Sequence, residues 1–116
     1  MNKRELGTHK EMDALHYLEK SGYDILERNF YMRGGEADLV ATEKDTLCFI
    51  EVKYRKDDSF GTALEAVTVS KRKKLIKTAR FYLLKHPEYA NMNIRFDVIA
   101  ITGSEISLIK GAFDAV

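Results

Sequence analysis

The sequence predicts a single α/β domain, with a central mixed sheet of five strands flanked by helices in the order αβββαββ. Three observations predict this fold. A length of 116 residues suits one hydrophobic core. Apolar residues recur with helical spacing in two segments and alternate in the segments between and after them. No repeat, linker or low-complexity segment interrupts that order, so the domain is expected to span residues 1–116.

The first half of the chain predicts one helix followed by three strands. The helix runs from Lys3 to Lys20 and ends at Ser21-Gly22, where glycine can adopt the left-handed conformation that terminates helices. β-forming residues then predict a strand from Tyr23 to Met32. Alternating residues predict a hairpin made of two further strands, Glu36 to Thr42 and Thr46 to Arg55.

The second half predicts a helix and two more strands. After a loop at Asp57 to Thr62, Ser70 is the predicted N-cap of a helix from Lys71 to about Lys85. Alternation then predicts a strand from Ile94 to Ile101 and a short last strand from Glu105 to Ile109.

The composition excludes several classes of protein. Hydrophobic residues make up 45% and charged residues 32%, which is too apolar for a disordered chain and too charged for a membrane protein. The one cysteine, Cys48, excludes a disulfide framework and a cysteine-based zinc site. The sequence contains no 18-residue apolar run and no apolar segment typical of a signal peptide. We therefore expect a soluble cytoplasmic protein with no membrane partner.

The net charge of +1 conceals a separation of charge along the chain. The segment from Val69 to Lys85 carries +7 without any Asp or Glu, which leaves −6 for the remainder. Phosphate contacts from such a segment would position a nucleic acid without reading its sequence. The residues that we expect to make them are Lys71, Lys73, Lys74 and Lys77, with Arg33, Arg55 and Lys56 extending the same track. A solvated helix face is the alternative interpretation.

Two carboxylates are predicted to face each other in the hairpin. An even-length turn centred between Lys44 and Asp45 places Asp38 directly opposite Glu51, with both side chains on one face. Like charges in such positions repel, and a divalent cation between them would offset the repulsion. Lys53 lies on the same face as Glu51 and adds a positive group. An odd-length turn would break the pairing, and two surface carboxylates would be the alternative.

A third carboxylate lies on the apolar stripe of the first helix. Glu11 is four residues after Gly7 and three before Ala14, so it shares their face. We expect it to point inward, where an unpaired charge is unfavourable, and so to have a cation or a hydrogen-bond donor beside it. A carboxylate that reaches solvent at the boundary is the alternative.

The patterns around the cysteine, Asp97 and the histidines favour structural roles for these residues. The alternation of the hairpin places Cys48 on the face opposite Glu51, which predicts a core thiol. Asp97 is predicted to pair with Arg95, two residues before it on the same strand, or with another base, and a role in the site is the alternative. The three histidines, His9, His16 and His86, have no metal-ligand spacing and are predicted to lie at the surface.

The hairpin and helix residues together resemble the PD-(D/E)XK nuclease core, which has the restriction-endonuclease-like fold. Asp38 precedes Glu51-Val52-Lys53 on the next strand, and Ala37 stands where that motif has proline. The chain also looks like the bacterial YraN family over nearly its whole length, a family similar in fold to archaeal Holliday-junction resolvases. The segments that carry this likeness are Gly35 to Ala41, Phe49 to Arg55, Glu65-Ala66-Val67, Arg95 to Val98 and Ala112-Phe113.

The resemblance implies metal-dependent hydrolysis of the phosphodiester backbone of a nucleic acid, with DNA, including branched DNA, as the expected substrate. Asp38, Glu51 and the backbone carbonyl of Val52 would bind Mg²⁺ or Mn²⁺. Lys53 would orient the attacking water or stabilise the developing charge, and Glu11 would be an outer ligand or would position a second metal ion or a water. The likeness to resolvases adds a homodimer as an expectation. A non-catalytic nucleic-acid-binding module on the same fold and a protein-interaction subunit are the alternatives.

Overall fold

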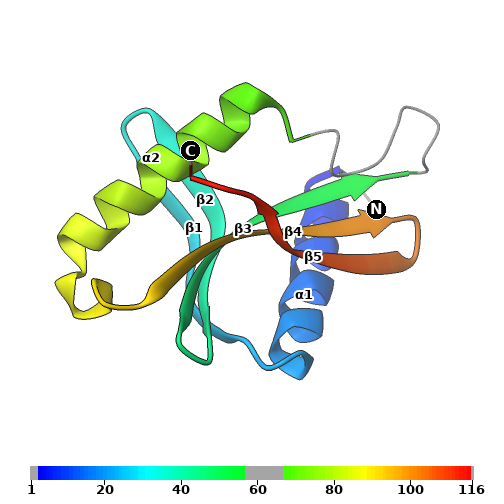
Figure 1. The fold of residues 1–116 in the computed structure, drawn as a ribbon. Coiled ribbons are helices and arrows are strands. Elements are labelled where there is room, and N and C mark those ends of the chain that lie inside the picture. The colour runs from blue at the N-terminus through cyan, green and yellow to red at the C-terminus, as the bar shows by residue number, and fades with distance from the viewer. Residues whose placement is uncertain (1–2, 57–66, 116) are drawn as a thin grey trace.

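The computed structural model describes residues 3–56 and 67–115, and its order of elements confirms the predicted αβββαββ (Figure 1). The loop expected at Asp57 to Thr62, the Glu65-Ala66 dipeptide and the side chain of His9 lie outside the described part. The elements are α1 (Lys3–Lys20), β1 (Asp24–Met32), β2 (Gly35–Glu43), β3 (Thr46–Arg55), α2 (Val69–Lys85), a short 3-10 helix η1 (Pro87–Tyr89), β4 (Asn93–Thr102) and β5 (Glu105–Phe113).

The sheet is mixed, as predicted. Its strand order is β1-β2-β3-β4-β5, and β3 pairs with β4 in parallel while the other three neighbouring pairs are antiparallel. A parallel pair needs a crossover connection, and α2 is the helix of that crossover. Helix α2 covers one face of the sheet and α1 covers the other (Figure 1).

Each helix forms its own hydrophobic core with the sheet. On the α1 side, Ala14, Leu15 and Leu18 pack with strand residues that include Cys48 and Ile50. On the α2 side, the strand residues include Phe49, and the buried helix residues are Leu75, Ala79 and Tyr82. Because successive strand residues point to opposite faces, β3 contributes to both cores, and Cys48 is the buried core thiol that the alternation predicts.

The register of the β2–β3 hairpin confirms an even-length turn. Paired residues run from Glu43 with Thr46 to Leu39 with Ile50, so the connection is the dipeptide Lys44-Asp45. Lys44 has a φ of 54°, a left-handed conformation that tight hairpin turns require. Asp38 and Glu51 directly follow the last pair of this ladder on their two strands.

Two boundaries differ from the sequence predictions by more than one residue. The N-cap of α2 is Thr68 and not Ser70: its backbone is extended, and its hydroxyl accepts a hydrogen bond from the Lys71 amide at 3.2 Å. Both residue types can cap a helix, and the backbone conformation at Thr68 decides between them. Strand β5 continues past Ile109 to Phe113, because Gly111, with a φ of 62°, redirects the strand so that the Phe113 ring stacks on Phe96.

Within residues 3–56 and 67–115, no helix is long and apolar enough to span a membrane. Helix α1 shows why: its 18 residues include charged side chains on the faces turned away from the sheet, such as Asp13, Glu19 and Lys20.

Candidate active site

Asp38 and Glu51 lie where the pairing of β2 and β3 ends, one position beyond the last pair, Leu39 and Ile50. The Oδ2 atom of Asp38 accepts a hydrogen bond from the backbone amide of Val52 at 2.8 Å. This bond holds the Asp38 carboxylate against β3, directly beside Glu51. Local hairpin register and one side-chain hydrogen bond are therefore enough to position both acids.

The environment of Asp38 opposes its ionisation. Burial, followed by the negative charge of Glu51, raises the pKa of Asp38 from the usual range to about 7. The hydrogen bond from Val52 and the positive charge of Lys71 act in the opposite direction without cancelling that rise. The two carboxylates thus form a pair whose mutual repulsion would be relieved by a cation.

Two lysines partly neutralise Glu51, whose side chain is 6% exposed. Lys71 Nζ, from the first turn of α2, lies 2.6 Å from Glu51 Oε1, and Lys53 Nζ, from β3 itself, lies 3.5 Å from the same atom. The hydrogen bond to Glu51 raises the pKa of Lys71. Burial and the adjacent ammonium of Lys71 lower the pKa of Lys53. Lys53 is therefore the lysine of this pair that gives up a proton more readily.

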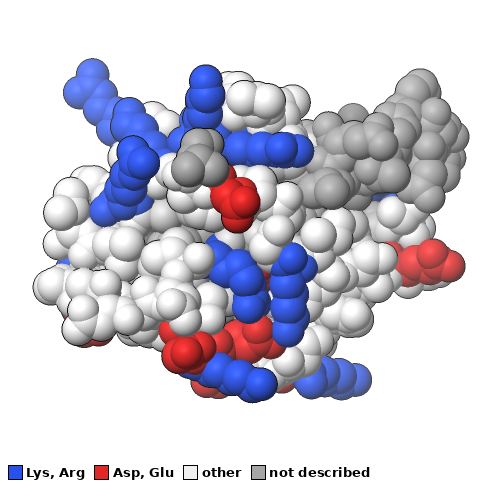
Figure 2. Space-filling view, in the orientation of Figure 1, with Lys and Arg blue, Asp and Glu red and all other residues white. Residues whose placement is uncertain are grey.

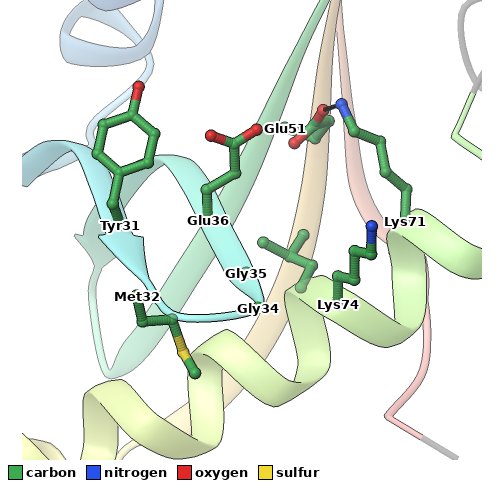
Figure 3. Close-up of a pocket in the computed structure, with 9 residues that line it drawn as sticks. Tyr31, Met32, Gly34, Gly35, Glu36, Glu51, Lys71 and Lys74 are labelled. Atoms are coloured by element: carbon green, nitrogen blue, oxygen red, sulfur yellow. Dashed lines mark hydrogen bonds and ion pairs between the residues drawn. The ribbon is translucent and has the colours of Figure 1, made fainter.

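A cavity of about 390 Å³ lies beside Glu51, between the β1–β2 turn and α2 (Figure 3). In the figure, Tyr31 and Glu36 stand on the side of β1 and β2, whereas Lys71 and Lys74 reach in from α2. Its full lining is Tyr31, Met32, Gly34, Gly35, Glu36, Glu51, Lys71, Lys74 and Leu75. A ligand in this cavity would touch the buried Glu51 carboxylate and two ammonium groups at once.

Gly35 sets the distance between the two walls of the cavity. A Cβ atom at this position would collide with the hydroxyl of Thr78 and press on the backbone carbonyl of Lys74. Thr78 cannot move away easily, because it is fully buried and its hydroxyl donates to that same carbonyl at 2.7 Å. Only glycine allows the β1–β2 turn to approach α2 this closely.

The contacts that Glu11 makes in the described part of the structure are with β1 and not with Asp38 or Glu51. Its half-buried carboxylate accepts a hydrogen bond from Asn29 Nδ2 at 3.1 Å and lies 4.0 Å from a guanidinium nitrogen of Arg28, both on β1. It therefore has the donor and the cation that its place on the helix requires. Its predicted role as an outer ligand stays a prediction.

The residues that could share a metal ion are Asp38 and Glu51. No group of three or more His, Cys, Asp or Glu residues with the geometry of a metal site occurs in the described part of the chain. A magnesium ion does not need such a group, because it is commonly held by one or two carboxylates together with substrate phosphates and water. The donor set fits that ion, provided that the Lys71 ammonium moves off the Glu51 oxygen that it contacts.

The predicted phosphate-binding residues fall in two places. Lys73, Lys74 and Lys77 are exposed on α2, over which blue side chains gather at the upper left of Figure 2. The first turn of this helix contains no acidic residue. Arg33 is exposed in the β1–β2 turn beside α2, whereas Arg55 and Lys56 lie at the far end of β3.

Sequence reasoning did not identify two of the residues that line the cavity, Tyr31 and Met32. Nothing in their spacing distinguishes them from other residues of a strand. The contact of Lys71 with Glu51 was also not anticipated, although Lys71 itself was a predicted phosphate-binding residue. These residues can be recognised as part of a site only when the structure shows that the β1–β2 turn lies against α2.

Comparisons with known proteins identify the family. The model of the uncharacterised protein family UPF0102 matches residues 10–101. A UPF0102 protein of Lachnoclostridium phytofermentans is 45% identical over 115 residues, covering 99% of this chain and 98% of the relative. Relatives from Vibrio campbellii and Francisella tularensis are 44% and 43% identical, covering 96% and 97% of this chain and 93% and 97% of their own lengths. The chain therefore belongs to the UPF0102 family, which is the YraN family that its motifs resemble.

Proposed function

We propose that this protein is a metal-dependent phosphodiesterase that cuts a nucleic acid, with DNA as the preferred substrate. The observation that carries the proposal is the pair of facing carboxylates, Asp38 and Glu51, which two lysines accompany at the edge of a cavity. Groups whose pKa values are shifted by burial and by neighbouring charges are frequent at catalytic sites.

The chain's own residues supply binding and proton handling. Asp38, Glu51 and the carbonyl of Val52 would hold Mg²⁺ or Mn²⁺, which when bound polarises a phosphoryl oxygen and acidifies water. Lys53 would orient the attacking water through its Nζ atom, or stabilise the negative charge that develops on the phosphate. Its lowered pKa also makes it easier for the Lys53 ammonium to release a proton.

Helix α2 would supply the substrate contacts. Lys73, Lys74 and Lys77 are exposed and would bind backbone phosphates, and Lys71 would turn from Glu51 toward a phosphate oxygen when a metal ion is present. Arg33 would extend this contact at the β1–β2 turn, and Arg55 and Lys56 would add contacts at the far end of β3. A branched substrate would need two such sites, which a symmetric homodimer would provide.

The test is cleavage of labelled single-stranded, duplex, flap and four-way-junction DNA, and of RNA, with Mg²⁺ or Mn²⁺. We expect Asp38→Ala and Glu51→Ala to reduce cleavage by at least about 100-fold, because removal of groups that hold the reacting centre costs several kcal/mol. Nucleic-acid affinity should be nearly unchanged in both. The matched control is Glu105→Ala, which removes an exposed carboxylate from the far edge of the sheet. Cleavage that survives in Asp38→Ala would reject the site.

A non-catalytic nucleic-acid-binding module is the second candidate, and one observation favours it. The Lys71 ammonium lies 2.6 Å from Glu51, so Glu51 has a partner that neutralises it without a metal ion. In that case Glu51 would serve to anchor the first turn of α2. Tight binding that falls steeply with salt, with no cleavage under any metal condition, would favour this function.

A further inference from the structure

The cavity beside Glu51 has two walls of different chemistry. The α2 wall presents the ammonium groups of Lys71 and Lys74, whereas the wall from β1 and β2 presents an aromatic ring, a thioether and a carboxylate from Tyr31, Met32 and Glu36 (Figure 3). Phosphate groups explain the first wall but not the second. The second wall therefore calls for a ligand part that is flat, partly apolar and able to donate hydrogen bonds.

Tyr31 provides the aromatic ring of this wall. Its side chain is 67% exposed, whereas Phe30, the residue before it, is buried in the α2-side core and contacts Tyr82. Tyr31 pairs across the strands with Glu36, so the ring and the carboxylate are neighbours. An aromatic ring that is left in solvent beside a carboxylate and a cavity is suited to stack on a ligand ring.

We propose that this cavity receives a single unpaired nucleobase next to the phosphate at the Asp38–Glu51 pair. This inference rests on the proposed function and deepens it. Tyr31 stacks on the face of the base, and Lys74 binds the phosphate of the same nucleotide. The Glu36 carboxylate accepts a hydrogen bond from the edge of the base.

The base must be unpaired for a geometric reason. A volume of about 390 Å³ lies at the small end of the range for ligand cavities, roughly 300 to 1,000 Å³, and accommodates one nucleotide and not a double helix. A base inside a duplex has both faces covered by its neighbours, so it cannot offer one to Tyr31. The substrate class is therefore single-stranded nucleic acid, or a branched or frayed structure with an unpaired nucleotide beside the cut phosphate.

Glu36 adds a preference among bases. A carboxylate only accepts hydrogen bonds, so it pairs well with the exposed amino group of cytosine, whereas the one donor on the edge of an unpaired thymine, N3–H, lies between two carbonyl oxygens that repel a carboxylate. Gln in its place would present both a donor and an acceptor. We therefore expect binding of oligodeoxycytidine to exceed that of oligothymidine in the wild-type protein, and this preference to diminish in Glu36→Gln.

The experiment measures binding without cleavage. Fluorescence anisotropy with EDTA present would compare labelled oligodeoxycytidine with a duplex of the same length for wild-type protein, Tyr31→Ala and Tyr31→Phe. Tyr31→Ala should weaken single-strand binding by roughly 5- to 100-fold, the usual effect of losing one stacked base, and leave duplex binding unchanged. Tyr31→Phe keeps the ring and should bind as the wild type does. Because Tyr31 is largely exposed, both variants should fold, which circular dichroism would verify.

The outcomes separate this inference from the proposed function. An equal loss of single-strand and duplex binding in Tyr31→Ala, no loss in either, or no binding of oligodeoxycytidine by the wild type would overturn the inference. If Tyr31→Ala loses single-strand binding selectively while no metal condition supports cleavage, the base site stands and the nuclease proposal falls. If cleavage occurs but Tyr31 is irrelevant to binding, the nuclease stands and the base site falls.

Discussion

Two polar clusters lie on opposite sides of the sheet, and they differ in how completely their charges are paired. The site cluster is Asp38, Glu51, Lys53 and Lys71. The anchor cluster is Tyr23, Glu43, Arg95, Asp97 and Lys110. Each contains two acids, one of them almost fully buried, and two bases. The arrangement of these charges, and not their number, distinguishes the clusters.

In the anchor cluster, both carboxylates accept hydrogen bonds from neighbouring donors. Asp97 is fully buried and accepts four hydrogen bonds between 2.8 and 2.9 Å, two from Arg95 and one each from the Tyr23 hydroxyl and the Gly111 amide. Arg95 and Lys110 both bond to Glu43, and the bond from Lys110 contributes most to lowering the pKa of that acid. The cluster links β2, β4, β5 and the residue before β1, and it confirms the predicted Arg95–Asp97 pair.

In the site cluster the two acids face each other. Asp38 accepts a hydrogen bond from the Val52 amide, but burial, followed by the negative charge of Glu51, raises the pKa of Asp38 to about 7. This cluster also borders a cavity, whereas the buried Tyr23 of the anchor cluster packs in the core between α1 and the sheet. Buried carboxylates that are fully paired with donors and cations hold the elements of the fold together. Two carboxylates that lack enough positive charge and lie beside a cavity are suited to bind a ligand.

The largest expected effect is on the anchor cluster. Asp97→Asn should lower the free energy of unfolding by about 3 kcal/mol or more, because Arg95 and Tyr23 would face an amide in place of a buried carboxylate. Urea unfolding followed by circular dichroism would measure the change. A loss under about 1 kcal/mol would contradict the view that this cluster anchors the fold.

The next effect has the opposite sign and depends on pH. Between the usual Asp pKa near 4 and about 7, the folded protein binds the Asp38 proton more tightly than the unfolded chain, so wild-type stability falls as pH rises through this window. Asparagine does not titrate, so Asp38→Asn removes this pH-dependent loss of stability. In EDTA the variant should match the wild type near pH 4 and exceed its unfolding free energy above pH 7, by a few kcal/mol at most, since one pKa unit equals about 1.4 kcal/mol. Thermal unfolding across pH measures this, and an Asp38→Asn protein less stable than the wild type at pH 8 would contradict it.

The smallest expected effect comes from a matched pair of lysines. Lys71→Gln should destabilise the protein by about 1 kcal/mol, because Glu51 would keep only the more distant Lys53 and its repulsion of Asp38 would be offset less. Lys110→Gln, a change at a lysine of similar exposure, should cost about half as much or less, because Arg95 still holds Glu43. Urea unfolding of both variants makes the comparison. Equal losses would show that the two clusters do not differ as described.

The sequence predicted much of the candidate site because the hairpin is local. The dipeptide turn Lys44-Asp45 determines the register, and period-two alternation then places Asp38 and Glu51 together with Lys53. The predicted bounds of α1 and β3 also match the structure. These features depend on spacing within a few residues, which a sequence displays directly. The roles assigned to the site residues stay predictions.

The sequence alone determined the element order, the hairpin register and the concentration of positive charge in α2, because each follows from neighbouring residues. Only the tertiary structure decided that Lys71 meets Glu51, that Glu11 bonds to Asn29, and that Gly35 brings the β1–β2 turn against α2 to form a cavity. These contacts join residues from separate elements. The crossover of α2 and the packing of both helices on a twisted sheet set such distances, and no periodicity along the chain records them.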